Sequence, residues 1–265
     1  VTIYDGDDPA MPMWMVFNHN DSGTTMLGRG DVDATSVSAE NSILCIGSSG
    51  TSYGTLSIIN FVSEECTIDF ANAYTRTGGV VQRNNNGQKM YANGNPAIVN
   101  MHVNDIAMTV LPNAPIDSAT GLPIPTIAVA TDGGVSVIKD DGSVVDLTYV
   151  KSTNNSSGHV SFTKTNGLVW SSRVTSGKYV YILELNTLPT ADSADAPDAV
   201  YGNFGQGNTS MDLNLLGTSS FGIAKDNMIG NAQGLTVLDQ NTTTPSEGSV
   251  AYITSDYNTG YMVGD

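Results

Sequence analysis

Gly54-Thr-Leu-Ser-Ile-Ile59 is the first of four short segments that decide the fold expected for this chain. Each segment begins with glycine and continues into β-branched or aromatic residues, which favour strands. The other three cover residues 134–138, 177–183 and 234–238. An apolar run precedes each segment, and a further run precedes that in three cases. A repeating unit of three or four short strands is typical of β-propeller blades. Since one blade cannot bury both of its faces alone, several must stack around an axis.

The sequence therefore predicts an all-β fold, a β-propeller with four to five or more blades of short antiparallel strands. Residues 1–265 are expected to form one propeller-like domain, and the predicted blades and end strands cover residues 35–70, 103–149, 159–185, 219–241, 1–18 and 250–265. The strand near residue 250 either completes the fourth blade or joins another. The chain starts and stops within predicted strands and has no initiator methionine, so we expect a portion of a longer protein.

Four residues are predicted to pack inward at equivalent places on the third strands of their blades. They follow the blade glycine by three or four positions, and they are Ile58, Val137, Val180 and Val237. The two cysteines are predicted to stay unpaired. Cys45 falls in the second strand of its blade and Cys66 in the fourth, and second neighbours in a sheet lie about 9–10 Å apart, too far for a disulfide.

Composition excludes several classes of function. The net charge is −16, from 26 acidic and 10 basic residues, and the basic residues are scattered along the chain. Nucleic-acid binding requires a basic stripe, and anionic membrane surfaces attract basic segments, so both partners are disfavoured. No run of 18 apolar residues is present, which predicts that the chain has no membrane span.

The candidate catalytic residues are few. Gly50-Thr-Ser-Tyr-Gly54 matches the pattern of a nucleophile elbow around Ser52, but that motif requires a helix after the strand and none is predicted here. The histidines His19, His102 and His159 are far apart, and no Cys-x-x-Cys pair accompanies them, so neither zinc spacing nor a base next to a nucleophile is recognisable. No phosphate-binding glycine loop is followed by a helix. The sequence therefore predicts no catalytic, metal or cofactor site and no enzymatic activity.

Binding motifs are equally weak. Two acidic clusters, residues 5–8 and 192–198, offer carboxylates to calcium, but neither matches the twelve-residue calcium loop, so solvated acidic loops are expected. Arg29-Gly-Asp31 is an integrin-type tripeptide of a length that recurs by chance. Four aromatic residues lie in or beside polar loops, where they either stack on sugars or pack over blade edges; these are Tyr201, Phe204, Tyr257 and Tyr261.

Two longer stretches carry a family likeness, residues 103–139 and residues 246–265. Both resemble segments of virion structural proteins of tailed, largely marine, bacteriophages. In that family a propeller-like region often precedes a laminin-G-like jelly roll. The resemblance implies a particle component that is tail-associated and has an adhesive or architectural role. The jelly roll is not part of this chain, so sugar binding does not transfer with the resemblance.

Three interpretations of function follow. The first is a non-enzymatic structural module of a phage tail or tail fibre, which serves as a scaffold and contacts a host-surface glycan. The alternatives are a glycan-active propeller enzyme of the depolymerase type, and a neck or capsid component without receptor binding. On the first interpretation the partners are other virion proteins, including further copies of the chain, and the location is the extracellular particle.

Overall fold

The computed structural model of the chain describes residues 1–18, 24–29, 32–51, 53–69, 72–149, 156–173, 180–203, 211–213, 221–224, 228–231, 234–239 and 249–254. The elements in this described part are β-strands, apart from one 3-10 turn, η1 (Val80–Gln82). The predicted all-β class is confirmed. The chain divides into two compact units, residues 1–132 with 136–144, and residues 133–135 with 145–265.

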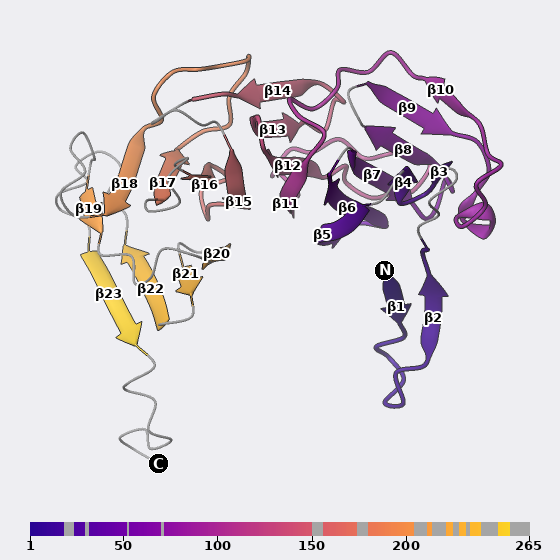
Figure 1. The fold of residues 1–265 in the computed structure, drawn as a ribbon, viewed down its shortest axis with the longest axis horizontal. Coiled ribbons are helices and arrows are strands. Elements are labelled where there is room, and N and C mark those ends of the chain that lie inside the picture. Colours follow the sequence, from indigo (N-terminus) through magenta and orange to yellow (C-terminus); the bar gives the residue numbers. More distant parts are fainter. Residues whose placement is uncertain are drawn as a thin grey trace. The chain divides into compact units, whose positions relative to one another are not determined.

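The largest sheet belongs to the first unit and is antiparallel, with the strand order β10-β9-β8-β7-β6-β5 (Figure 1). Its strands are β5 (Val32–Glu40), β6 (Ile43–Gly50), β7 (Gly54–Asn60), β8 (Cys66–Asp69), β9 (Ala73–Arg76) and β10 (Met90–Ala92). The strands β5 to β8 correspond to the first predicted blade. Strands β9 and β10 extend that sheet beyond the predicted blade, and both are short: β9 has four residues and β10 has three.

The second sheet has the order β11-β12-β13-β14 and matches the second predicted blade. Its strands are β11 (Val103–Thr109), β12 (Thr126–Thr131), β13 (Gly134–Ile138) and β14 (Val144–Leu147). Proline-rich residues 112–125 connect β11 to β12. Asp141-Gly142 makes the turn between β13 and β14, where Gly142 adopts a φ of 81°, a left-handed conformation that glycine tolerates best.

Two further sheets lie in the second unit. The first has the order β15-β16-β17-β18-β19, with β15 (Ser157–Phe162), β16 (Leu168–Arg173), β17 (Val180–Leu185), β18 (Ala199–Asn203) and β19 (Met211–Leu213). The second has the order β20-β21-β22-β23, with β20 (Phe221–Ala224), β21 (Met228–Asn231), β22 (Gly234–Asp239) and β23 (Ser249–Thr254). Strand β23 therefore completes the fourth strand group. Strand β21 is unpredicted, and it separates β20 from the glycine-initiated strand β22.

The glycine-initiated segments occupy the same place in their sheets. Strands β7, β13, β17 and β22 are each third in chain order within the sheet, and three of them begin at the predicted glycine: Gly54, Gly134 and Gly234. The glycine that precedes β17 lies outside the described residues. Each of the four segments thus supplies the third strand of its own sheet.

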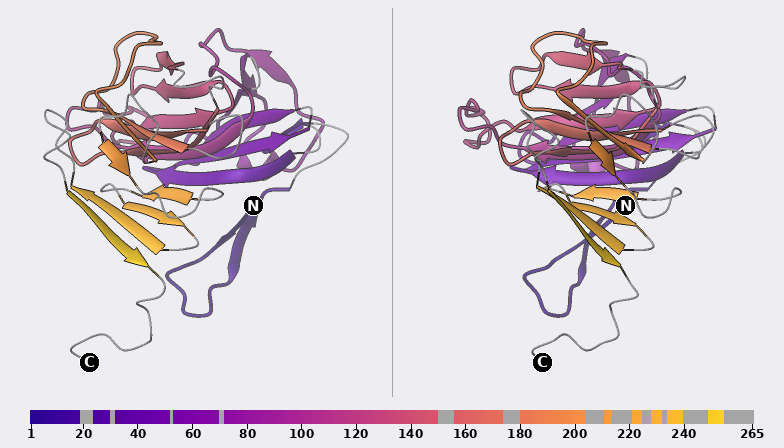
Figure 2. Two further views of the ribbon diagram at one scale, coloured as in Figure 1. Left: turned by 60° about the vertical axis from the view of Figure 1, so that its left-hand side comes forward. Right: turned by 90° about the vertical axis from the view of Figure 1, so that its left-hand side faces the viewer.

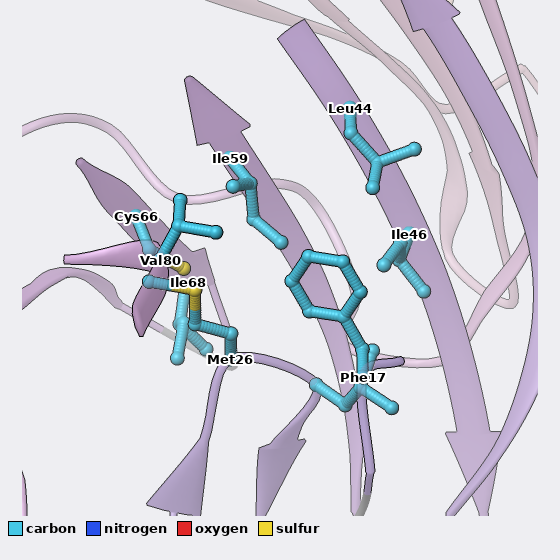
Figure 3. Packing of buried hydrophobic residues seen from close by; sticks show 9 residues of the cluster. Phe17, Met26, Leu44, Ile46, Ile59, Cys66, Ile68 and Val80 are labelled. Atoms are coloured by element: carbon cyan, nitrogen blue, oxygen red, sulfur yellow. The ribbon is translucent and has the colours of Figure 1, made fainter. Parts of the chain in front are cut away.

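The sheet of β5 to β10 buries apolar side chains on both faces. One face and the segments that cover it form the Phe17 cluster (Figure 3), whose buried members are Phe17, Met26, Leu27, Leu44, Ile46, Ile59, Cys66, Ile68 and Val80. The other face packs against β11 and β12 in the Val103 cluster, whose buried members are Cys45, Leu56, Ile98, Val103, Ile106, Ile127 and Val129. Side chains alternate in direction along β6 and β7, so successive apolar residues enter different clusters.

Hydrogen bonds and small residues bring β11 close to β5 and β6. The Thr35 hydroxyl donates to the Val103 carbonyl over 2.7 Å, and the Ser36 hydroxyl donates to the Asp105 carboxylate over 2.9 Å. A Cβ atom on Gly47 would collide with the Val103 side chain. The two sheets therefore pack face to face with polar pairing along one margin.

The four inward-packing predictions have different outcomes. Val137 is fully buried in β13, as predicted. Ile58 is only partly buried, because it packs at the margin of the Val103 cluster while Leu56, two residues earlier on the same face, fills its interior. The side chains of Val180 and Val237 lie outside the described part of the structure, so those two predictions stand untested.

The end-strand region predicted over residues 1–18 forms a hairpin of β1 (Thr2–Tyr4) and β2 (Met13–Val16). Figures 1 and 2 show this hairpin extending away from the sheet of β5 to β8, and residue 17 leads from it into the Phe17 cluster. A second, very short hairpin, β3 (Thr24–Thr25) with β4 (Gly28–Arg29), places Met26 and Leu27 in the same cluster.

Candidate functional site

The serine and histidines that were considered as a nucleophile and bases are not brought together as a catalytic group among the residues that the structure describes. Ser52 and His19 lie outside those residues. His102 precedes β11, and its Nδ1 is 3.2 Å from the Ser49 hydroxyl oxygen at the end of β6. His159 lies in β15, where its backbone N–H donates to the Ser171 hydroxyl over 2.9 Å. The Ser49–His102 pair continues the row of polar contacts between the first two sheets.

The acidic cluster at residues 5–8 forms the turn of the N-terminal hairpin. The Asp5 carboxylate accepts the backbone N–H of Asp7 over 3.0 Å, and the Asp8 carboxylate accepts the N–H of Ala10 over 2.8 Å. Short-range bonds of this kind are what aspartates make in turns. These carboxylates hold the turn, and one oxygen of each is already engaged.

The second acidic cluster, residues 192–198, lies along the edge of β14. The Asp192 carboxylate accepts the backbone N–H of Asp146 over 3.0 Å, and Ser193 exchanges backbone hydrogen bonds with Asp146 and Thr148. Further along, the Asp198 carboxylate accepts the backbone N–H of Asn186 over 2.7 Å. The loop thus uses its carboxylates to attach itself to neighbouring backbone.

The remaining candidate binding residues lie largely where the structure gives no side-chain description. Arg29 ends β4 and Tyr201 lies in β18, both without a described side chain, and the rest fall outside the described residues: Gly30, Asp31, Phe204, Tyr257 and Tyr261. Within the described ranges, no three histidine, cysteine, aspartate or glutamate side chains gather as a metal site would require. No helix in the described part has the length and apolar character needed to cross a membrane.

A buried arginine organises the segment after β9. Arg76 is 3% exposed, and its Nη2 donates to the carbonyls of Gln82 and Asn85, each over 2.7 Å. Burial lowers the pKa of Arg76, with the Cys66 thiol acting in the opposite direction. Charged donors make the stronger class of hydrogen bond. Arg76 therefore fixes the loop that contains η1, and the sequence alone offered no sign of this role.

The N-terminal hairpin carries the densest group of exposed apolar side chains in the described residues. Tyr4, Met11, Met13 and Trp14 are each more than half exposed. The Trp14 ring lies 5.8 Å from the Phe61 ring, measured between centroids, and Phe61 in turn stacks edge-on with Phe17 at 6.4 Å. The sequence pattern predicts strands in this region but not that these side chains face solvent. We call residues 4–14 the hairpin tip.

Both cysteines are buried and free. Strand β7 lies between β6, which carries Cys45, and β8, which carries Cys66, so the predicted strand order is confirmed. Burial raises the pKa of the Cys45 thiol, and it raises the pKa of the Cys66 thiol to about 12 against the opposing effect of Arg76. Because the thiolate is the reactive form, both thiols should be inert in the folded protein.

We expect thiol reagents to label neither cysteine in the native protein and both after denaturation without reductant. Mass spectrometry of the intact, alkylated chain measures this. Ser118→Cys supplies an exposed control thiol in the 112–125 connection and should be labelled within the native fold. Rapid native labelling would contradict the burial of the two thiols, and absence of label after denaturation would reveal a disulfide.

No protein family matches the chain, and no curated protein is significantly similar to it.

Proposed function

We propose that this chain is a non-enzymatic structural module of a phage virion, associated with the tail or a tail fibre, and that its sheets are blades of a β-propeller. One observation carries the architectural part of the proposal. In the first unit β11, the first strand of the second sheet, lies against β5, β6 and β7. In the second unit β20, the first strand of its sheet, lies against β15 and β16. In each unit, therefore, the first strand of one sheet lies against the first strands of the sheet that precedes it in the chain.

The packing around β5 to β8 supports the same architecture. This sheet is covered on both faces by apolar clusters, as an inner blade of a stack would be. Propeller blades are four-stranded sheets that bury their faces against their neighbours. A stack of this kind is a rigid body that presents loops at the strand ends, which suits a scaffold in an assembled particle.

The assignment to a virion is supported by the resemblance of residues 103–139 and 246–265 to phage structural proteins. The net charge of −16 fits a module that contacts neutral host-surface sugars, since these bind by stacking and hydrogen bonding rather than by charge.

Two experiments test this proposal. Antibodies against the purified chain should label the tail region of intact particles produced by the phage that encodes it, as seen by immunogold electron microscopy. Detection in infected-cell lysate but not in washed particles would overturn the virion assignment.

Purified chain incubated with host-envelope polysaccharide should release no oligosaccharide. Release that is lost on replacing a pair of aspartates would favour the depolymerase alternative, and saturable binding without release would support adhesion.

A further inference from the structure

The hairpin tip is an exposed apolar surface without an assigned role. The exposed fractions of its large side chains are 53% for Tyr4, 57% for Met11, 62% for Met13 and 60% for Trp14. Tyr4 and Met13 are direct partners across the hairpin, so two of these side chains are neighbours by register. Aromatic residues and methionine are enriched in protein interfaces, and clustered exposed apolar groups mark interaction sites.

The base of the hairpin is held firmly to the first unit. Phe17 is 1% exposed within the Phe17 cluster, and its backbone N–H donates to the Val1 carbonyl over 2.8 Å. Arg83 Nε and Asn84 Nδ2 both donate to the Val16 carbonyl, and the Arg83 guanidinium lies 5.7 Å from the centre of the Phe17 ring. An anchored hairpin presents its tip in a defined orientation, which lowers the ordering cost of binding.

The hairpin pairing is irregular at Trp14. Ile3 pairs with Met15 and Tyr4 pairs with Met13, so Trp14 is the extra residue of a β-bulge. A bulge re-aims the side chain that it inserts. Trp14 rests against Phe61 yet keeps most of its surface in solvent. Tryptophan is the residue type most enriched among binding hot spots.

The negative charge of the hairpin indicates which kinds of binding partner fit it. Residues 1–18 contain no lysine, arginine or histidine, and the turn of the hairpin carries three exposed carboxylates, those of Asp5, Asp7 and Asp8. The chain as a whole carries −16, so a second copy would bring like charges together at this surface. An anionic membrane would be repelled for the same reason. A partner whose apolar side chains are flanked by basic side chains is complementary to both features.

We propose that the hairpin tip is a docking element that packs Trp14 and Met13 against an apolar surface of a different protein, and that lysine or arginine side chains beside this surface pair with Asp5, Asp7 and Asp8. This inference goes beyond the proposed function, because it concerns only the first unit and does not require propeller closure or a place in a virion.

The test uses a defined probe, a blocked nine-residue peptide of alternating leucine and lysine, and a control peptide in which glutamate replaces lysine. The full chain is titrated by calorimetry and by tryptophan fluorescence. Its two tryptophans report separately, because Trp14 is exposed whereas Trp170 is 3% exposed. We expect saturable binding of the leucine–lysine peptide with a blue shift of Trp14 emission, and no binding of the leucine–glutamate peptide.

Variants locate the site. Trp14→Ser and Met13→Ser should each weaken binding about tenfold, as loss of a hot-spot side chain does. Combined Asp5→Asn, Asp7→Asn and Asp8→Asn keeps the oxygens that accept the turn hydrogen bonds but removes the charge, so binding should weaken and lose its salt dependence. Ile116→Ser removes a side chain that is 60% exposed elsewhere in the first unit and should leave the affinity unchanged.

Four results would overturn the docking proposal. These are absence of binding to the leucine–lysine peptide, an equal loss of affinity in Ile116→Ser, a Trp14 blue shift with phosphatidylcholine vesicles that exceeds the shift with peptide, and self-association of the chain that Trp14→Ser abolishes. The last two would assign the tip to a membrane surface or to a second copy. None of these results bears on whether the chain belongs to a virion, so failure here and failure of the proposed function are distinguishable.

Discussion

Replacing Gly54 with alanine should lower the free energy of unfolding by about 3 kcal/mol, at the upper end of the usual cost of overpacking. Gly54 opens β7, where the segment before β11 crosses it. A Cβ atom there would collide with the Met101 carbonyl oxygen and lie 2.9 Å from the His102 Cα. Both obstacles are backbone, so no side-chain rotation can relieve the clash, and the first two sheets would have to move apart.

Urea unfolding followed by far-ultraviolet circular dichroism measures this loss. Gly6→Ala is the matched control, because no atom lies within 4 Å of the corresponding Cβ position, and its effect should stay within about 0.5 kcal/mol. Equal stabilities of Gly54→Ala and Gly6→Ala would show that the close approach of the two sheets at this point is not required by the fold.

Periodicity and glycine placement were sufficient to predict four strand groups, but not the strands β9, β10, β18 and β19 that extend two of the sheets. Gly54, Gly134 and Gly234 each start the third strand of a sheet, and the glycine requirement at Gly134 is visible in its φ of 133° and in the proximity of the Leu147 carbonyl. These are backbone demands that a sequence expresses directly, because only glycine meets them at low cost.

The strands that the sequence did not predict depend on tertiary contacts. Strand β9 has only four residues and ends with the charged Arg76, so its local pattern does not suggest a strand. It forms because Arg76 is held by the carbonyls of Gln82 and Asn85, and because β8 offers it an edge. The two hydrogen bonds end on backbone carbonyls, which every residue type carries, so residue types do not reveal them, and strand propensity yields to such context.

The sequence pattern also failed to predict that the apolar residues of the hairpin tip are exposed. Met13-Trp-Met-Val-Phe17 is uniformly apolar, which indicates a strand buried on both faces. In the structure only its last residues enter the Phe17 cluster, whereas Met13 and Trp14 remain more than half exposed. The hairpin has two strands and no third, so its outer half has nothing to cover it within the described first unit. An apolar strand that folding leaves uncovered is consistent with a docking role.

Phe17 connects that surface to the core, and Phe17→Ala should cost about 3–5 kcal/mol of unfolding free energy. The ring is 1% exposed, and Figure 3 shows it between the side chains of Ile46 and Ile59. It also meets Phe61 edge-on and the Arg83 guanidinium over its face. Truncation would remove all of these contacts and leave a cavity where the hairpin joins the sheet.

Hydrogen exchange in the hairpin distinguishes the loss of its anchor from a general loss of stability. In Phe17→Ala the backbone amides of β1 and β2 should exchange hydrogen faster than those of β6 and β7, because the anchor is lost while the sheet retains the Val103 cluster on its other face. Met13→Ala, on the exposed part of the same hairpin, should change the unfolding free energy by less than about 0.5 kcal/mol. If Phe17→Ala and Met13→Ala proved equally mild, the hairpin would be held by its backbone contacts to Arg83 and Asn84 alone, and the ring would not be its anchor.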